Sequence, residues 1–299
     1  MIDAAVLLGF GGPTAPQEIR PFLDRVLRGR PVPASRYEAV VDHYMAIGGR
    51  SPYNELTYRQ ANALAEELRA RGRPVPVHVG FRNMPPSIAD TFSSLQQNGA
   101  RSVFAIPLAA YGGVSSADRY VAEAEQAVRA FGGALHVEYA APYFDHPLFI
   151  QAHVSRIREA LPATPGTSEL ALIFTAHSVP RTASLPYARQ LEYAASRIAE
   201  QVGVTSWRLA YQSRSGSPAE PWLEPDVRDV LRAVAQRGAR DAILAPIGFT
   251  CEHLEVLYDL DVEAAAVARE CGIAMTRARA LDDHPLFVAM LADLVECTS

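Results

Sequence analysis

The chain has 299 residues, of which 49% are hydrophobic and 20% are charged, an ordinary globular composition. Its formal net charge of −5 gives no basic footprint, so we expect no nucleic-acid partner. No apolar run approaches the roughly 18–20 residues that span a bilayer, and the N-terminal sequence lacks the features of a signal peptide. We therefore expect no transmembrane segment and a cytoplasmic location, with peripheral membrane contact left open.

Short apolar segments alternate with amphipathic helices along the chain. In chain order, strands are predicted at residues 4–10, 75–81, 102–108, 170–176, 206–212 and 241–249. Helices are predicted at residues 57–72, 118–133 and 186–203. Strands that alternate with helices are typical of parallel βαβ units, so the sequence predicts an α/β fold.

An internal repeat divides the chain. Residues 95–113, LQQNGARSVFAIPLAAYGG, parallel residues 234–252, VAQRGARDAILAPIGFTCE. The pentapeptide DHPLF occurs at 145–149 and again at 283–287. The near-constant offset predicts two similar Rossmann-like domains, 1–145 and 146–299, whose parallel sheets face a central cleft. Because ligands of open α/β sheets bind outside the carboxyl ends of the strands, we expect the ligand in that cleft.

Polar chemistry is concentrated in the second half, after the predicted strands. His177 follows the first strand of that half, and an acidic stripe with His253 beside it follows the strand at 241–249. The stripe occupies positions i, i+3, i+7 and i+11 of a helix: Glu252, Glu255, Asp259 and Glu263. A structural histidine and a solvated acidic face near a helix N-terminus are one interpretation. Because no Lys or Arg interrupts the stripe, a weakly held divalent cation is the other.

Basic and aromatic residues gather in the first half. Arg25, Arg28 and Arg30 precede a Pro-rich loop, which is either a solvated loop or a contact for ligand carboxylates. Residues 47–55, IGGRSPYNE, add Ser51 and glycine flexibility. The GFGGP turn lacks the full G-x-G-x-x-G pattern, so NAD binding is not expected.

With these residues assembled, the chain resembles the ferrochelatase family over nearly its whole length. The likeness rests on motifs that occur in the family's order: LLGFGGP, HYMAIGGRSP, VGFRNMPP, AHSVP, YQSRSGSPAEPWLEPDV and GFTCEHLEVLYDLD. The resemblance implies two chelatase-type domains and insertion of Fe²⁺ into a porphyrin, coproporphyrin III or protoporphyrin IX, in heme biosynthesis. Fe²⁺ would be a substrate, and no permanent cofactor is expected.

The resemblance also implies roles for individual residues. His177 and Glu255 match the family's catalytic pair, which is also part of its metal site. Asp259 and Glu263 match acids that are proposed to bind the metal ion on its way to that pair. The matching porphyrin contacts are Phe10, Arg28, Arg30, Ser51 and Tyr120. A histidine with a near-neutral pKa can accept a pyrrole proton or ligate the metal. Apolar walls for the flat ring are expected from Phe10, Phe81 and Tyr111.

Departures from the family pattern bear on the substrate. Phe10 stands where many coproporphyrin-using relatives carry Tyr, so an axial tyrosinate on the product would be lost. The cysteines are too few for a four-thiolate iron–sulfur cluster. The short chain favours coproporphyrin as the substrate, whereas Phe10 points away from the typical coproporphyrin-using group, so both porphyrins stay open.

Rival interpretations remain open at this stage. A cobalt or sirohydrochlorin chelatase would tend to use a histidine pair, whereas His177 faces Glu255 here. A non-catalytic heme- or porphyrin-binding protein would not need the acidic stripe. The missing signal peptide disfavours a periplasmic solute binder. The sequence leaves a monomer and a homodimer equally open.

Overall fold

A computed structural model describes residues 2–113, 116–132, 134–162, 170–215 and 220–298. Residues 216–219, part of the YQSRSGSPAEPWLEPDV motif, therefore lie outside the described residues. The chain forms two compact units. Unit 1 comprises Met1–Leu108, Ser116–Pro142 and Asp282–Ser299, and unit 2 comprises Ala109–Ser115 and Tyr143–Leu281.

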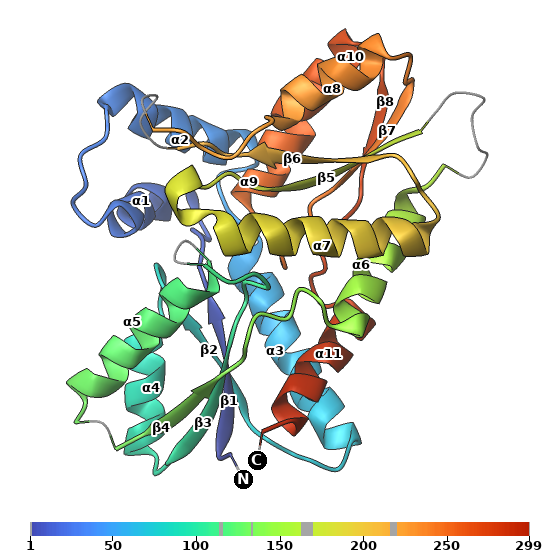
Figure 1. Ribbon diagram of the computed structural model, residues 1–299. Helices are drawn as coiled ribbons and strands as arrows, with labels where there is room; N and C mark the ends of the chain where they lie inside the picture. The colour runs from blue at the N-terminus through green and yellow to red at the C-terminus, as the bar shows by residue number, and fades with distance from the viewer. Residues whose placement is uncertain (1, 114–115, 133, 163–169, 216–219, 299) are drawn as a thin grey trace. The chain divides into compact units, whose positions relative to one another are not determined.

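Unit 1 is built on a parallel sheet of four strands in the order β2-β1-β3-β4. The strands are β1 (Ala4–Gly9), β2 (Val77–Phe81), β3 (Ser102–Pro107) and β4 (His136–Tyr139). Its helices are η1 (Pro16–Glu18), α1 (Ile19–Leu27), α2 (Ala34–Ala46), α3 (Tyr53–Ala70), α4 (Ile88–Gln97), α5 (Ala117–Ala130) and α11 (Pro285–Glu296). Figure 1 shows α4 and α5 on one face of this sheet, and α3 and α11 on the other. The central strand β1 is buried along its whole length.

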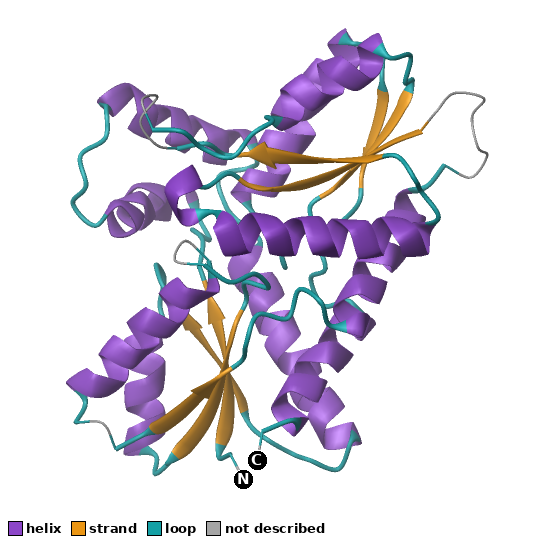
Figure 2. Ribbon diagram, in the orientation of Figure 1, coloured by secondary structure: helices purple, strands orange, loops and turns teal. Residues whose placement is uncertain are grey.

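Unit 2 repeats this plan, with a parallel sheet in the order β6-β5-β7-β8. Figure 2 shows the strands of both units in orange and the helices in purple. Its strands are β5 (Leu170–His177), β6 (Trp207–Gln212), β7 (Asp241–Ala245) and β8 (Ala274–Arg277). Its helical segments are α6 (Pro147–Ala160), η2 (Arg181–Ala183), α7 (Leu185–Val202), α8 (Val227–Gln236), α9 (Leu254–Leu257), the π-helix η3 (Asp259–Ala264) and α10 (Ala265–Glu270). The predicted α/β class with two similar parallel-sheet domains is confirmed.

The two copies of DHPLF begin equivalent helices in the same way. His146 precedes α6, and its Nδ1 accepts a hydrogen bond from the Leu148 amide at 3.2 Å. His284 precedes α11 and accepts from the Leu286 amide at the same distance. In both copies a proline follows the histidine at the first helical position, where its missing amide hydrogen costs nothing. The sequence repeat therefore corresponds to a structural repeat.

Two strands were not predicted, and several were predicted too long, β7 by the most. β4 and β8 have four residues each and are partly exposed, so neither carries a long apolar run. β7 ends at Ala245 rather than Phe249, because Pro246 has no amide hydrogen to continue the ladder.

The C-terminal helix packs with unit 1, whereas the predicted division placed residues 282–299 with the second half. α11 lies along α3, and its Phe287, Leu291 and Val295 are fully buried. Arg71, just after α3, donates to Asp293 at 2.6 Å and to Glu296 at 2.9 Å. Both apolar contact and ion pairs therefore attach this helix to unit 1. In the part of the chain that the structure describes, no helix is both long and apolar enough to span a membrane.

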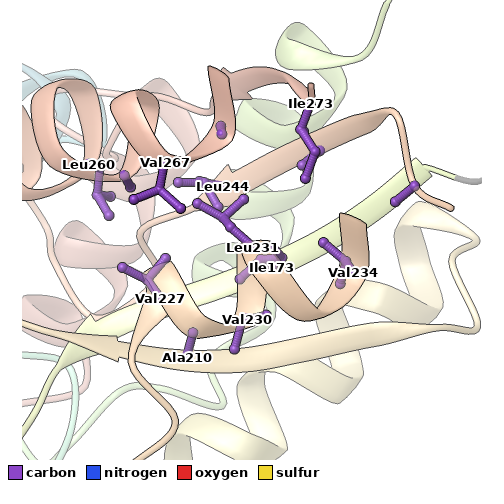
Figure 3. Close-up of a cluster of buried hydrophobic side chains, with 14 of the residues drawn as sticks. Ile173, Ala210, Val227, Val230, Leu231, Val234, Leu244, Leu260, Val267 and Ile273 are labelled. Atoms are coloured by element: carbon purple, nitrogen blue, oxygen red, sulfur yellow. The ribbon is translucent and has the colours of Figure 1, made fainter. Parts of the chain in front are cut away.

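A buried cluster in unit 2 orients the segment that carries the acidic stripe (Figure 3). Val256, Leu260 and Ala264 are fully buried in this cluster, beside Leu231 of α8 and Leu244 of β7. With these apolar side chains facing the core, the positions one residue before each of them project from a neighbouring face. The core therefore restricts the faces from which these acidic side chains can project.

Candidate active site

His177 is the last residue of β5, at the carboxyl end of the central strand of unit 2. Its Nδ1 donates to the carbonyl oxygen of Ser178, and its own carbonyl accepts from the Tyr187 hydroxyl at 3.2 Å. Gly248 lies so close to β5 that a Cβ there would sit 2.6 Å from the Ala176 Cβ. With Nδ1 carrying a proton, Nε2 is the nitrogen left for chemistry.

Glu255, on the single turn α9, faces the Nε2 side of that ring. Its Oε1 lies 3.4 Å from Nε2 of His177, and its Oε2 lies 3.6 Å from Nε2 of His253. The side chains of His177 and Glu255 remain 30% and 33% exposed, so a ligand can reach both. The backbone of Glu255 is held by Gln212, the residue paired with His177 in β6, whose amide donates to the Glu255 carbonyl. The predicted pair is therefore brought together.

Asp259 begins the π-helix one turn further on. Its Oδ2 accepts a hydrogen bond from the hydroxyl of Ser213. Ser213 directly follows β6 and has φ 61°, a left-handed conformation that is uncommon for a residue other than glycine. Such strained residues cluster at functional sites. In the π-helix the carbonyl of Tyr258 accepts from both the Val262 and the Glu263 amides, each at 3.0 Å.

The charges of these three side chains are strongly coupled. Burial lowers the pKa of His177, but the charge and contact of Glu255 outweigh burial and raise this pKa to about 9. Burial likewise disfavours the charged form of Glu255, yet His177 holds its pKa well below the usual range. Burial and repulsion from Glu255 raise the pKa of Asp259 to about 7, against the hydrogen bond from Ser213. At neutral pH the pair is ionised, and Asp259 lies near its own midpoint.

The expectation that the acidic stripe lacks counter-charge is wrong at two positions. Glu252 is buried and accepts from Arg277 at 2.8 Å, so it points away from the other acids. Glu263 lies 3.5 Å from Arg228 of α8. Both cations come from segments distant in sequence, which is why the local pattern did not reveal them. Among the described residues, no three His, Cys, Asp or Glu side chains form a ready-made metal-binding group.

Three arginines meet one carboxylate in unit 1. Glu123 of α5 lies 2.7 Å from Arg82, 2.9 Å from Arg28 and 4.0 Å from Arg119. Arg28 is 45% exposed, whereas only 9% of the Arg82 side chain is exposed. One anionic group among three guanidinium groups leaves a net positive surface, which suits a ligand carboxylate.

Two of the predicted porphyrin contacts surround Arg82. Its guanidinium carbon lies 5.6 Å from the centre of the Phe10 ring and 5.1 Å from that of Tyr120. These are cation–π distances. Phe10, Tyr120 and Arg28 therefore belong to one cluster, which we call the arginine cluster together with Arg82, Arg119 and Glu123.

The other two predicted contacts, Arg30 and Ser51, differ in their relation to this cluster. Burial and the nearby charges of Arg82 and Arg30 lower the pKa of Arg119, so the Arg30 charge lies within reach of the cluster. Arg30 is exposed, and its guanidinium donates to the carbonyls of Leu27 and Val26 in the preceding helix. Ser51 is buried beside Gly12, where an added Cβ would lie 2.7 Å from the Ser51 Cβ. The structure gives Arg30 and Ser51 local structural contacts.

Two of the three expected ring walls are wrong. Phe81 is fully buried between Tyr53 and Tyr58 in unit 1. Tyr111 is 1% exposed, stacks on Phe144 in unit 2 and donates its hydroxyl to the Ile247 carbonyl at 2.9 Å. Aromatic residues after strands signalled a flat ligand in the sequence, but these two belong to the cores of their units. Phe10 alone keeps partial exposure.

Several contacts of the site were not assigned from the sequence. Ser213 and Gln212 lie within the YQSRSGSPAEPWLEPDV motif, but nothing in the motif indicates their partners. His253 was visible beside the acidic stripe and contacts Glu255. Arg82 and Glu123 are separated by 41 residues, so only the fold brings them together.

Solved chelatase structures share this fold. SirB from Bacillus subtilis with Fe³⁺ superposes with a TM-score of 0.61 at 14% identity, covering 99% of this chain and 95% of that one. The sirohydrochlorin chelatase SirB from Bacillus subtilis subspecies spizizenii, in complex with cobalt, gives 0.57 at 12% identity, covering 99% and 94%. At this level of identity the likeness shows the fold alone: the chain has the chelatase-type fold.

The chain belongs to the ferrochelatase family, whose sequence model matches residues 3–298. A coproporphyrin III ferrochelatase from Mycolicibacterium paratuberculosis is 42% identical over 300 residues, covering 98% of this chain and 87% of the relative. One from Mycolicibacterium smegmatis is 40% identical over 302 residues, covering 98% and 89%. The resemblance found in the motifs is therefore confirmed, as is the assignment to the metal-inserting chelatases.

Proposed function

We propose that this protein inserts Fe²⁺ into coproporphyrin III, with His177 and Glu255 as the catalytic pair. The observation that carries the proposal is the 3.4 Å contact between these side chains at the carboxyl end of β5. The relatives at about 40% identity, named coproporphyrin III ferrochelatases, support the choice of porphyrin. Fe²⁺ enters as a substrate.

The coupled pKa values suggest how the pair works. Insertion replaces two pyrrole protons by one Fe²⁺ ion. When Fe²⁺ binds the Glu255 carboxylate, that carboxylate no longer stabilises the imidazolium, so His177 releases the proton on Nε2 to solvent. Nδ1 keeps the proton that it donates to the Ser178 carbonyl oxygen. The lone pair of Nε2 is then free to accept one pyrrole proton. The other pyrrole proton leaves to solvent.

Asp259 and Glu263 supply oxygen ligands that Fe²⁺ meets before it reaches His177 and Glu255. Divalent cations held through carboxylates exchange their waters stepwise, so a row of acids can pass the ion inward. Asp259 titrates near pH 7, and its Ser213 hydrogen bond holds the carboxylate in place. Glu263, beside Arg228, is the predicted ligand that lies furthest along the chain from Glu255.

The arginine cluster supports a tetracarboxylate substrate. Coproporphyrin III carries four propionates and protoporphyrin IX carries two, so the former gains more from a surface rich in guanidinium groups. We propose that Arg28, Tyr120 and Phe10 contact the porphyrin there. Arg30 and Ser51, which the family pattern also implies, act indirectly in this proposal. Arg30 binds the carbonyls of Leu27 and Val26 just before Arg28, and Ser51 packs against Gly12, two residues after Phe10.

The test is anaerobic incubation of the protein with Fe²⁺ and either coproporphyrin III or protoporphyrin IX, followed by the Soret band. We expect metalation of coproporphyrin III, and a loss of about 10²–10⁴-fold in rate for His177→Ala. His136→Ala, at an exposed histidine of β4, is the matched control and should retain activity. A preference for protoporphyrin IX would overturn the substrate. Tight porphyrin binding without insertion, or insertion only of Co²⁺ into sirohydrochlorin, would overturn the reaction.

A further inference from the structure

Arg277, the last residue of β8, joins two carboxylates on either side of Glu255 in sequence. Its Nε and Nη2 bind the two carboxylate oxygens of Asp261 at 2.6 and 2.9 Å. Its Nη1 donates to Oε1 of Glu252 at 2.8 Å, and that oxygen also accepts from the Ala280 amide at 2.8 Å. The side chains of Arg277 and Glu252 are 12% and 10% exposed. One guanidinium therefore anchors both residue 252 and residue 261.

The segment between these anchors has little stability of its own. α9 has only four residues, and the π-helix η3 follows directly. Isolated short helices are marginal in water, and π-helices are rare single-turn features. Something outside the segment must therefore hold its geometry, and the buried cluster supplies only the apolar side of that support.

The anchor at Asp261 determines how the helical turn is rotated. Residues two positions apart on a helix point to nearly opposite sides. With the Asp261 carboxylate bound to Arg277, Asp259 must point the other way, toward Ser213. Glu255, one turn before Asp259, then faces His177. The bidentate geometry matters here, because an Arg–carboxylate fork fixes orientation as well as distance.

We propose that Arg277 is a positioning residue for metal delivery: by binding Glu252 and Asp261 together, it sets the rotation at which Glu255 and Asp259 face His177. This inference rests on the proposed function, in which Fe²⁺ reaches the porphyrin through those two acids. Arg277 touches neither substrate in the proposal. Loss of the Arg277 side chain should therefore weaken the binding of Fe²⁺ and leave porphyrin binding unchanged.

The direction in which the KM for Fe²⁺ changes when Arg277 is removed separates a positioning role from simple electrostatics. Removing a cation beside several acids makes the local potential more negative, which by charge alone attracts Fe²⁺ and lowers its KM. If positioning dominates, the KM for Fe²⁺ rises instead. The paired variant Arg277→Gln/Glu252→Gln keeps the net charge and leaves no carboxylate buried without its arginine. Any change in that variant therefore reports geometry.

The experiment compares metal and porphyrin parameters in the wild type, Arg277→Gln/Glu252→Gln, Asp261→Asn and Arg277→Lys. We expect the paired variant to raise the KM for Fe²⁺ by roughly 10–100-fold, as for other residues that orient metal ligands. The KM for coproporphyrin III should stay within about twofold. Arg277→Lys should be intermediate, because an ammonium group cannot form the fork with Asp261. Arg197→Gln removes an exposed arginine–carboxylate pair on α7 and serves as the control.

A second readout avoids turnover. The affinity of the porphyrin-free protein for Co²⁺, followed by its visible absorption, should fall in the paired variant and in Asp261→Asn. An unchanged or lower KM for Fe²⁺ in both, with wild-type Co²⁺ affinity, would overturn the positioning role. A rise in both the metal and the porphyrin KM would show general loss of structure and would also overturn it. If the wild type itself neither inserts Fe²⁺ nor binds Co²⁺, the proposed function fails instead, which is a distinct result.

Discussion

At the scale of single residues, Asp259 combines a half-buried position with a carboxyl group that must ionise to hold a cation. Burial and the neighbouring Glu255 raise its pKa to about 7, whereas the ordinary value is 3.8. The folded state therefore binds a proton more tightly than the unfolded chain does. Ionising Asp259 in the folded protein consequently costs stability, and the proposed metal-binding role requires that cost.

This cost predicts how Asp259→Asn changes stability with pH. Because the folded pKa lies above the unfolded one, stability is lost as pH rises from about 4 to 7 and stays low above 7. Asparagine does not ionise, so the variant should melt at a higher temperature than the wild type, with a larger difference at pH 8 than at pH 5.5. Scanning calorimetry at both pH values measures it. Asp229→Asn, at an exposed aspartate of α8, should show no such trend. An equal difference at both pH values would contradict the assignment.

The arginine cluster gives a second prediction, in which two neighbouring arginines differ. Arg28 reaches Glu123 at 2.9 Å and belongs to the cluster, whereas Arg30 donates to carbonyls of the helix that precedes it. Loss of one charge-assisted contact to a propionate costs roughly a factor of ten in affinity. Arg28→Gln should therefore raise the KM for coproporphyrin III about tenfold, and Arg30→Gln should change it less than about twofold. Steady-state kinetics at fixed Fe²⁺ measures both. Equal effects would show that both side chains bind the porphyrin.

At the scale of elements, the long strands and the helices α3, α5 and α7 were predicted from the sequence, whereas α1, α2, α4, α8 and the irregular structure were not. Continuous apolar runs identified the six longest strands, because buried parallel strands need apolar residues on both faces. β4 and β8 escaped because four partly exposed residues carry no such run. The acidic stripe was predicted as one regular helix, but it divides into α9, η3 and α10. Local periodicity does not reveal a π-helix, which depends on tertiary contacts such as those of Arg277.

The π-helix leads to a prediction about its register. It fits one residue more between its flanking turns than an α-helix would, since the Tyr258 carbonyl accepts from both Val262 and Glu263. Deleting Val262, which is 41% exposed, should restore regular α-helical bonds without disturbing the core. The side chains of Asp259 and Asp261 would then point elsewhere, so turnover should fall at least roughly tenfold while the melting temperature holds. Val262→Ala keeps the residue count and is the control. Full activity in the deletion would mean that the π-helix is dispensable.

At the scale of the whole molecule, the repeat predicted two similar units, and the fold of each followed from it. The place of the C-terminal helix did not follow. The second DHPLF copy suggested that residues 282–299 complete the second half, as the first copy introduces α6. Instead Arg71 and the apolar face of α3 hold α11. A repeat shows that two segments form similar elements, but packing partners depend on contacts that lie more than 200 residues apart in sequence.

Two separate cores predict that the units lose protection independently. Leu291 of α11 is fully buried in unit 1, and Leu231 of α8 is fully buried in unit 2. Truncating a buried leucine to alanine typically lowers the free energy of unfolding by roughly 2–5 kcal/mol. The core that contains the leucine is destabilised most. In hydrogen exchange, Leu291→Ala should release amides of β1 and α3 and leave β5 and β7 protected, because local opening follows contiguous packing. Leu231→Ala should give the reverse pattern. If either variant lowers protection equally in β1 and β5, the two units unfold as one cooperative structure. Their compact folds would then not correspond to separate units of stability.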